Sequence, residues 1–222
     1  MKTNQESRLV LKKNFSTTDH LQASNQLIEK CNEYNLLLCL GFIDYEKAFD
    51  SVEHAAIVQA LKKVNINENY VTMIETIYKE RIHMDNQISE ALEIQRGVRQ
   101  GDPISPKLFI TIIEQVFKEA DLKYGISIDG EYLRDLRSAD NVALCTEKEE
   151  ETEENLERLS SENKKVGLKI HKGKTKYMTN YITERPIVID NENIELITKY
   201  TYLSQTTTMK NRANEEIITR IR

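Results

Sequence analysis

The stretch from Leu36 to Asp50 limits the possible fold of this chain more than any other part of it. Leu36 to Gly41 is an uninterrupted apolar run with the length of a buried strand. The next residues, Phe-Ile-Asp-Tyr-Glu-Lys-Ala-Phe-Asp at 42–50, place a carboxylate, Asp44, where that strand should end. A charge at the edge of a core is costly unless a cation pairs with it or a metal ion binds it. Asp44 is therefore either a helix cap, a position where Asp is common, or one member of a charged site.

The length and composition of the chain limit the broad class of protein. Its 222 residues are enough for one domain with its own core, or for a fragment of a larger protein. The scattered Cys31, Cys39 and Cys145 lack the spacing of a zinc site or a disulfide framework, which predicts reduced thiols. No apolar run approaches the ~20 residues of a membrane span, and the first residues lack a signal-peptide core. We therefore expect an intracellular protein, in the cytoplasm and/or the nucleus, with no membrane partner.

The charge of the chain is unevenly distributed. The formal net charge of −5 would disfavour binding to nucleic acid if it were spread over the whole surface. The stretch 147–154 alone holds six Glu against one Lys and accounts for that balance. The remainder of the chain is neutral, so local basic grooves remain compatible with the sequence.

Two further stretches carry polar residues at the ends of predicted elements. The loop 96–102, Arg-Gly-Val-Arg-Gln-Gly-Asp, can bring backbone N–H groups and guanidinium groups close to phosphates. Ser105-Pro106 after it predicts the start of a helix, with Ser105 as the cap. Strands predicted at 133–136 and 142–145 would meet at Arg-Ser-Ala-Asp-Asn, where an Asp is usually a turn former. Helices and hairpins in this order predict an α+β domain.

These stretches together resemble the reverse transcriptase domain of non-LTR (LINE-type) retrotransposons. Residues 42–50 are similar to the first palm motif of that family, and residues 96–109 to the second. Residues 167–178, Gly-Leu-Lys-Ile-His-Lys-Gly-Lys-Thr-Lys-Tyr-Met, resemble its fourth motif, and Tyr-Thr-Tyr-Leu-Ser at 200–204 resembles the primer-gripping hairpin. The similarity keeps the order of the family and runs from about Phe15 to the C-terminus.

The resemblance implies a fold and a division of the chain. The expected fold is a right-hand polymerase palm, in which an antiparallel sheet is backed by helices, with incomplete fingers and thumb. Residues 1–222 would be a single reverse transcriptase domain fragment, with 1–35 as a remnant of the fingers, 36–205 as the palm and 206–222 as the start of the thumb connection. We expect a truncated and partly degraded copy of a mobile element, or one piece of a longer polypeptide.

The resemblance also implies a metal site. Nucleotidyl transfer uses two Mg²⁺ ions, and Mg²⁺ is usually held by only a few carboxylates. Asp44 matches the first-motif acid of the family, and Asp140 matches the first of two adjacent acids in its third motif. We therefore expect Asp44 and Asp140 to be catalytic metal ligands for Mg²⁺, with Mn²⁺ as a possible substitute. Asn141 stands at the second position of that pair, where it keeps the shape but removes a full negative charge, which predicts impaired catalysis.

Other roles are implied position by position. Lys174 would protonate the leaving pyrophosphate, although a lysine in such a basic cluster is more often solvated or phosphate-facing. Phe49 would exclude a ribose 2′-hydroxyl, or would simply pack in the core. The resemblance assigns nucleotide contacts to Ala48, Phe49, Gln100 and Gly101, and nucleic-acid contacts to Arg96, Arg99, Tyr202 and Leu203.

Three functions remain open at this stage. The first is an RNA-directed DNA polymerase palm whose partners are an RNA template, a DNA primer and dNTP. The second is a domain that binds nucleic acid or protein without catalysis, and the third is the product of an element remnant with no selected function. The sequence does not predict the oligomeric state.

Overall fold

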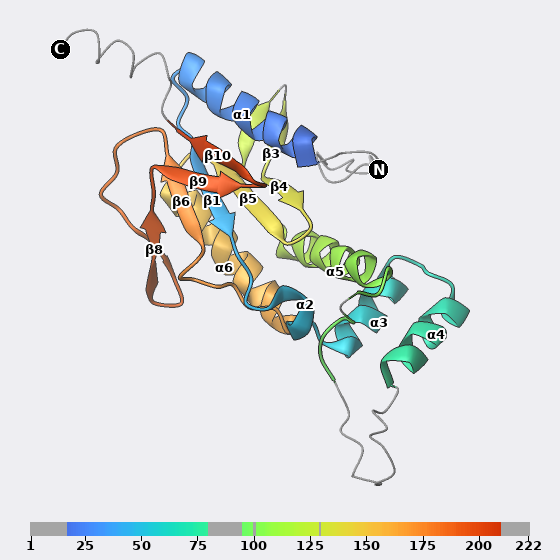
Figure 1. Cartoon of the computed structure of the whole chain (residues 1–222). Coiled ribbons are helices and arrows are strands. Elements are labelled where there is room, and N and C mark those ends of the chain that lie inside the picture. The colour runs from blue at the N-terminus through green and yellow to red at the C-terminus, as the bar shows by residue number, and fades with distance from the viewer. Residues whose placement is uncertain (1–16, 80–94, 100, 129, 210–222) are drawn as a thin grey trace, which may run out of the picture. The chain divides into compact units, whose positions relative to one another are not determined.

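A computed structural model describes residues 17–79, 95–99, 101–128 and 130–209 (Figure 1). The chain divides into two compact units, which we name by their content. The sheet unit comprises Met1–Asp44, Leu122–Arg158 and Ile170–Arg222, and the helical unit comprises Tyr45–Asp121 and Leu159–Lys169.

The sheet unit is organised around β1 (Cys39–Ile43), every residue of which is buried. β1 pairs antiparallel with β5 on one side and with β6 on the other. The apolar run therefore forms a central strand, although it begins at Cys39 and not at Leu36, which is half exposed. The six-stranded sheet has the order β4-β5-β1-β6-β8-β7, and the strands beside β1 are β4 (Asp135–Ser138), β5 (Asn141–Thr146), β6 (Lys176–Thr179), β7 (Ile187–Ile189) and β8 (Glu192–Leu196).

The sheet is mixed, because β6 and β8 pair in parallel. The prediction of an antiparallel sheet is therefore wrong for this pair, while the other strand pairs are antiparallel. The reason is the order of the last three strands: β7 lies at the outer edge, and a tight turn brings β8 back between β7 and β6. The chain thus inserts β8 beside β6 in the same direction.

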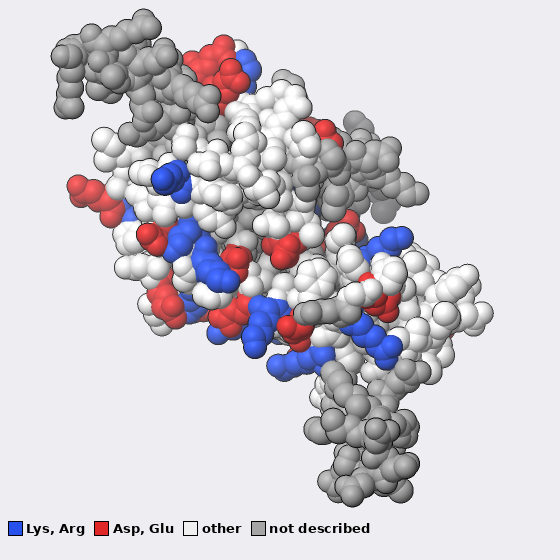
Figure 2. All heavy atoms as spheres, viewed as in Figure 1, with Lys and Arg blue, Asp and Glu red and all other residues white. Residues whose placement is uncertain are grey.

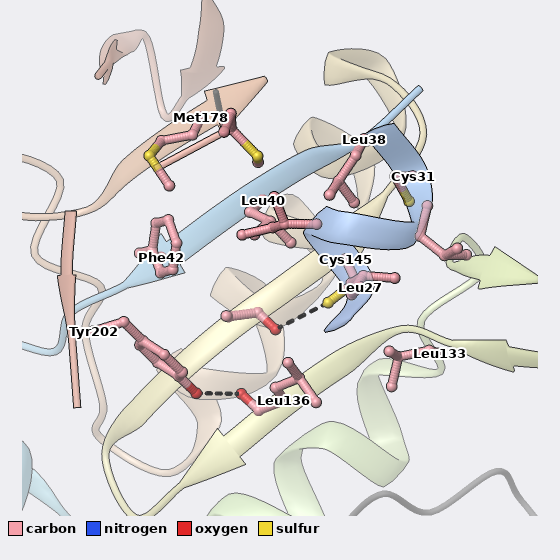
Figure 3. Packing of buried hydrophobic residues seen from close by; sticks show 14 residues of the cluster. Leu27, Cys31, Leu38, Leu40, Phe42, Leu133, Leu136, Cys145, Met178 and Tyr202 are labelled. Atoms are coloured by element: carbon pink, nitrogen blue, oxygen red, sulfur yellow. Dashed lines mark hydrogen bonds between the residues drawn. The ribbon is translucent and has the colours of Figure 1, made fainter. Parts of the chain in front are cut away.

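The two faces of β1 pack against different elements. Leu40 and Phe42 belong to a cluster that includes Leu27 and Cys31 of α1 (Thr17–Glu33), as Figure 3 shows. Gly41 faces α6 (Glu149–Lys165), where a Cβ on this residue would lie 2.9 Å from Thr152 Cγ2. Side chains alternate across a strand, so the sheet unit has helix on both faces. Two small hairpins complete the unit: β2 (Ile126–Ile128) with β3 (Glu131–Leu133), and β9 (Lys199–Tyr202) with β10 (Gln205–Thr208).

The helical unit is built on α5 (Ser105–Ala120), whose apolar residues recur at helical spacing and are buried, among them Leu108, Phe109, Ile112 and Val116. The remaining helices that lie wholly in this unit are α2 (Ala48–Ser51), α3 (His54–Lys63) and α4 (Glu68–Lys79). None of the helices in the described ranges is both long enough and apolar enough to cross a membrane.

The start of α5 corrects one detail of the sequence analysis. Pro106 lies in the first turn as predicted, but Ile104 is the N-cap residue and Ser105 is buried within the helix. The Asp102 carboxylate accepts a hydrogen bond from the Ile104 N–H at 3.0 Å instead. This bond forms an Asx turn just before the helix, because a short carboxylate reaches the backbone two residues onward. Within the described residues no side chain caps the first turn of α5, so the prediction of Ser105 as the cap is wrong.

Several hairpin turns contain residues with a left-handed backbone. In the β7–β8 turn these are Asp190 (φ 46°) and Asn191 (φ 65°), residue types that tolerate this conformation. In the β9–β10 turn they are Leu203 (φ 47°) and Ser204 (φ 69°), which do not. Positive φ at both central residues matches a type I′ turn, for which glycine at the second position is strongly preferred. The β9–β10 turn is therefore strained.

We expect Ser204→Gly to raise the free energy of unfolding by about 1 kcal/mol, because glycine adopts a positive φ without a steric penalty. Urea denaturation of the purified chain measures this. Ser127→Gly is the matched control. Ser127 is exposed in β2 and does not have a positive φ, so glycine should lower stability at this position. A loss of stability in both variants would contradict the strained turn.

Candidate active site

Asp44 lies directly after β1, and its peptide group is held from both directions. Its N–H donates to the Thr175 hydroxyl at 3.2 Å. Its carbonyl accepts from the His171 N–H at 2.8 Å. Both partners belong to one turn, 171–175, which precedes β6. The backbone of Asp44 is thus fixed at the end of β1, on the edge of the sheet where strands end, which is the edge meant below. Its half-buried side chain extends from this rigid position.

The 171–175 turn also carries Lys174. The turn is closed by hydrogen bonds from the N–H groups of Lys174 and Thr175 to the His171 carbonyl, at 3.0 and 2.8 Å. The Lys174 N–H also lies 3.3 Å from His171 Nδ1, which assigns the acceptor role to that nitrogen. The Lys174 side chain is exposed. One turn therefore both fixes Asp44 and presents a lysine beside it.

Asp140 lies at the tip of the β4–β5 hairpin. Ser138 pairs with Asn141, so only Ala139 and Asp140 form the turn. Ala139 has φ 55°, which a type II′ hairpin requires at this position and which usually selects glycine. A non-glycine residue held in this conformation stores strain of the kind that is common at functional sites.

Strand register brings these elements together around Asp44. Ile43 pairs with Val142 of β5, and Phe42 pairs with Lys176 of β6. Extending the β1–β5 register by one residue places Asp44 across from Asn141. On the other side the β1–β6 ladder ends at Lys176, and the 171–175 turn that carries Lys174 bonds the Asp44 peptide instead. Asp140 is next to Asn141, so four of the predicted catalytic residues converge at one edge of the sheet unit.

Asn141 interacts directly with Asp140. Its amide Nδ2 donates a hydrogen bond to Asp140 Oδ1 at 3.2 Å. An aspartate at this position could not donate that bond and would repel the Asp140 carboxylate. Asn141 therefore both removes a charge and occupies one acceptor position of the neighbouring carboxylate.

The β9–β10 hairpin also reaches this edge, through Tyr200. The Tyr200 ring stacks on Phe42 of β1, with 4.3 Å between ring centroids and 19° between planes. Burial, and further the charge of Asp44, raise the pKa of the Tyr200 hydroxyl. Sequence analysis gave Tyr200 no role of its own. The available signal was its spacing from Tyr202, since residues two apart in a strand share a face.

Tyr202, predicted to contact nucleic acid, is a core residue. Its side chain is 2% exposed, and its hydroxyl donates to the Leu136 carbonyl at 3.3 Å (Figure 3). Burial raises the pKa of this hydroxyl well above its ordinary value. Because the ring fills the space between β9 and the sheet, it presents no surface to a nucleic acid. Leu203, the next predicted contact, is partly exposed in the strained turn.

The helical unit holds the predicted nucleotide contacts. Ala48 is buried in α2, and the half-buried Phe49 ring stacks on Phe109 of α5 at 4.6 Å. The Val98 N–H donates to the Phe49 carbonyl at 2.7 Å. At Gly97 (φ 92°) a Cβ would lie 3.2 Å from the Asp50 carbonyl, so this close approach favours glycine. The first and second motifs are therefore joined by backbone contacts within this unit.

Both predicted arginines already have partners in the helical unit. Arg96 Nη2 lies 3.1 Å from Glu53 Oε1, and Arg99 Nη2 donates to the Ile77 carbonyl at 2.8 Å. Both side chains are exposed, so the guanidinium groups are open to solvent as well. Gly101 is exposed with φ 87°, and no atom lies within 4 Å of a Cβ placed there. Gln100 lies outside the described residues.

Comparison with known proteins assigns this arrangement to a family. Residues 3–210 match the family described as reverse transcriptase (RNA-dependent DNA polymerase). The match covers most of the chain, so the protein belongs to the reverse transcriptase family.

The sequence relatives are retrotransposon proteins, which confirms the resemblance to non-LTR elements. A retrovirus-related Pol polyprotein from the type-1 retrotransposable element R2 of Nasonia vitripennis is 29% identical over 171 residues, which is 71% of this chain and 17% of the relative. The R2 polyprotein of Popillia japonica is 34% identical over 46% of this chain and 15% of its own length. The R2DM polyprotein of Drosophila melanogaster is 29% identical over 47% of this chain. The chain thus spans 17% or less of the length of these relatives.

Solved structures confirm the palm-type α+β fold. Apo telomerase from Candida tropicalis, truncated of its C-terminal domain, matches with a TM-score of 0.51 and 16% identity over 86% of this chain and 39% of that chain. Telomerase from Candida albicans, in complex with a fragment of telomeric RNA, matches with a TM-score of 0.52 and 12% identity over 81% of this chain and 32% of that chain. Identities this low show the fold alone.

Reverse transcriptases generally use divalent metal ions, so the residues at the edge of the sheet unit can be tested for fit. Two carboxylates, from Asp44 and Asp140, are available there, and Mg²⁺ sites in proteins often contain only one or two. No group of three or more His, Cys, Asp or Glu residues suited to a metal ion occurs within the described ranges. Asp44 and Asp140 are therefore the residues that would hold a divalent cation, and Asn141 adds no third carboxylate.

We expect Thr175→Val to reduce the protection of the Asp44 N–H from hydrogen exchange. The substitution keeps the shape of the side chain but leaves the Asp44 N–H without its acceptor, which costs about 1–3 kcal/mol when the group is shielded from water. Hydrogen exchange should show faster exchange of the Asp44 amide. Thr175→Ser retains the hydroxyl and should preserve its protection. Equal exchange in both variants would contradict the role of this hydrogen bond.

We also expect Asp44→Asn to lower the pKa of Tyr200. The carboxylate of Asp44 disfavours the phenolate, so removing its charge stabilises the ionised form. The pKa should remain above its ordinary value, because burial is the larger cause and persists. Titration of ¹³C-labelled tyrosine by NMR measures the shift, with Glu131→Gln, an exposed acid of β3, as control. An unchanged pKa would show that Tyr200 does not sense Asp44.

Proposed function

We propose that this chain is the palm of an RNA-directed DNA polymerase that extends a DNA primer from dNTP on an RNA template. The single observation that supports this most strongly is the convergence of Asp44, Asp140 and Lys174 at one sheet edge in a member of the reverse transcriptase family. The RNA complex of the Candida albicans telomerase is a further reason to expect nucleic acid as the partner. In this proposal residues 36–205 are the palm, and the protein acts inside the cell.

Asp44 and Asp140 would hold a divalent cation, Mg²⁺ or Mn²⁺. When bound, such a cation stabilises the negative charge that develops on phosphoryl oxygens during nucleotidyl transfer. The bonds to Thr175 and His171 hold the Asp44 backbone in place, so its carboxylate does not have to be ordered when the cation binds. Asp140 is positioned by a two-residue turn that leaves little freedom to the hairpin tip.

Lys174 is the group that would deliver a proton to the leaving pyrophosphate. Its ammonium is exposed, and its turn is bonded to the backbone of Asp44. General acids act when they lie within hydrogen-bond reach of the group that they protonate. Lys174 is assigned this role because its turn bonds the backbone of Asp44 and its side chain is exposed to an incoming ligand.

Asn141 makes this polymerase a weak one. With two carboxylates in place of three, the site has less negative charge to offset a divalent cation. The Asn141 amide also directs a hydrogen-bond donor at Asp140, which competes with a cation for the same oxygen. The same observation favours a second candidate function, binding of primer and template without catalysis.

Primer extension on poly(rA) with oligo(dT) tests the proposed activity. We expect the chain to extend the primer slowly with Mg²⁺ or Mn²⁺, and Asn141→Asp to raise the rate by roughly 10- to 100-fold, the range by which supporting groups change metal sites. Asn193→Asp in β8 adds the same charge at an exposed position and should change nothing. Asp44→Asn in the Asn141→Asp background should abolish extension.

Two results would count against the proposed catalysis. If Asn141→Asp is folded and binds primer and template but extends nothing, the binding function without catalysis is favoured. If Asn193→Asp raises the rate of primer extension as much as Asn141→Asp does, the increase is caused by net charge and not by the site.

A further inference from the structure

The 171–175 turn and the start of β6 carry three lysines at alternate positions. Lys172 Nζ lies 2.8 Å from Glu192 Oε1 of β8, and Lys176 Nζ lies 2.6 Å from Glu195 Oε2 of the same strand. Lys174 lies between them in sequence, exposed, and forms no ion pair with the residues that the structure describes. Two of the three lysines are therefore paired with carboxylates of the same chain.

The parallel pairing of β6 and β8 produces these ion pairs. Lys176 lies directly beside Glu195 in the ladder, so their side chains meet across two neighbouring strands. The β7–β8 turn brings Asp190 to Lys172 Nζ, with its carbonyl at 3.4 Å and its carboxylate Oδ2 at 4.0 Å, and Glu192 lies two residues onward. The β6–β8 pair thus places Glu195 beside Lys176, and β8 lies beside β6 in Figure 1.

The two partners of each pair differ in exposure. The side chains of Lys172 and Lys176 are 18% and 20% exposed, whereas those of Glu192 and Glu195 are 64% and 65% exposed. The carboxylates are therefore the outer partners and the lysines the inner ones. An ion pair with one largely exposed partner weakens with salt, so a competing anion can displace the outer carboxylates.

We propose that Lys172 and Lys176 form a binding site for the phosphates of a nucleic-acid backbone, and that Glu192 and Glu195 compete with those phosphates. This inference rests on the proposed function, since the site adjoins the turn that holds Asp44. With both glutamates bound, the lysines are largely neutralised and Lys174 alone is open to phosphate. Figure 2 shows acidic and basic side chains next to one another on part of the viewed surface.

The two competing anions, the glutamate carboxylates and the nucleic-acid phosphates, differ in charge and in how they are held. A carboxylate held on a neighbouring strand is present at high effective concentration but carries one charge. A nucleic-acid backbone offers successive phosphates, and its binding releases counterions. Nucleic acid therefore replaces Glu192 and Glu195 most readily at low salt, where counterion release contributes most.

The test uses the full chain with Glu192→Gln and Glu195→Gln together. Glutamine keeps the size of the side chain but does not neutralise a lysine. Fluorescence anisotropy with a labelled RNA–DNA primer-template duplex should show about three- to tenfold tighter binding at 50 mM salt than for the unmodified chain. The slope of log K against log salt should steepen by about one to two: about one for Lys176, and less for Lys172, which keeps the Asp190 carboxylate beside it.

Three controls separate the site from net charge. Glu131→Gln with Glu157→Gln removes the same charge from exposed positions of the sheet unit and should change affinity little. Adding Lys172→Ala and Lys176→Ala to the glutamine pair should cancel the gain. Circular dichroism of each variant checks that the fold is retained.

The outcomes distinguish this inference from the proposed function. If the unmodified chain binds the duplex and the variant with both glutamines binds it no more tightly, the glutamates do not compete with phosphates. The proposed polymerase function is not contradicted by that result. If tripolyphosphate binding increases and duplex binding does not, the site takes the phosphates of a nucleotide, and the assignment to a nucleic-acid backbone is overturned. Absence of duplex binding by every variant would overturn both proposals.

Discussion

The two hydrogen bonds that hold the peptide of Asp44 are the interaction on which the site in the sheet unit depends. They join the end of β1 to the 171–175 turn, and the register of β1 with β5 and β6 then places the other groups around Asp44. A carboxylate at a strand end is costly without such support. The central, fully buried strand explains why a charged site can be built at a rigid edge of this sheet.

The chemistry of this edge is governed by a balance of charge. Asn141 removes one negative charge beside Asp140 and adds a hydrogen-bond donor, so the pull on a cation is reduced. On the other side of Asp44, Glu192 and Glu195 neutralise lysines that could bind phosphate. Both features reduce the attraction of the edge for the groups that a polymerase has to bind. They follow from single side chains, while the backbone arrangement of the family is retained.

The sequence predicted those parts of the fold that depend on local patterns. The apolar run identified the central strand, and the motifs identified Asp44, Asp140 and Lys174, which the structure brings to one edge. It did not predict β8, because Glu192 and Glu195 make that strand polar, and parallel pairing with β6 joins segments that are distant in the chain. The burial of Tyr202 was missed for a related reason. Which face of a strand is covered depends on the hairpin that packs on it, and no local pattern shows this.

The binding of Mn²⁺ to the full chain, measured by electron paramagnetic resonance of the free ion, tests most directly whether Asp44 and Asp140 form a cation site. We predict one weak site in the unmodified chain, its loss in both Asp44→Asn and Asp140→Asn, and tighter binding in Asn141→Asp. Equal Mn²⁺ affinity in all four proteins would contradict the site, because the cation would then bind elsewhere on the chain.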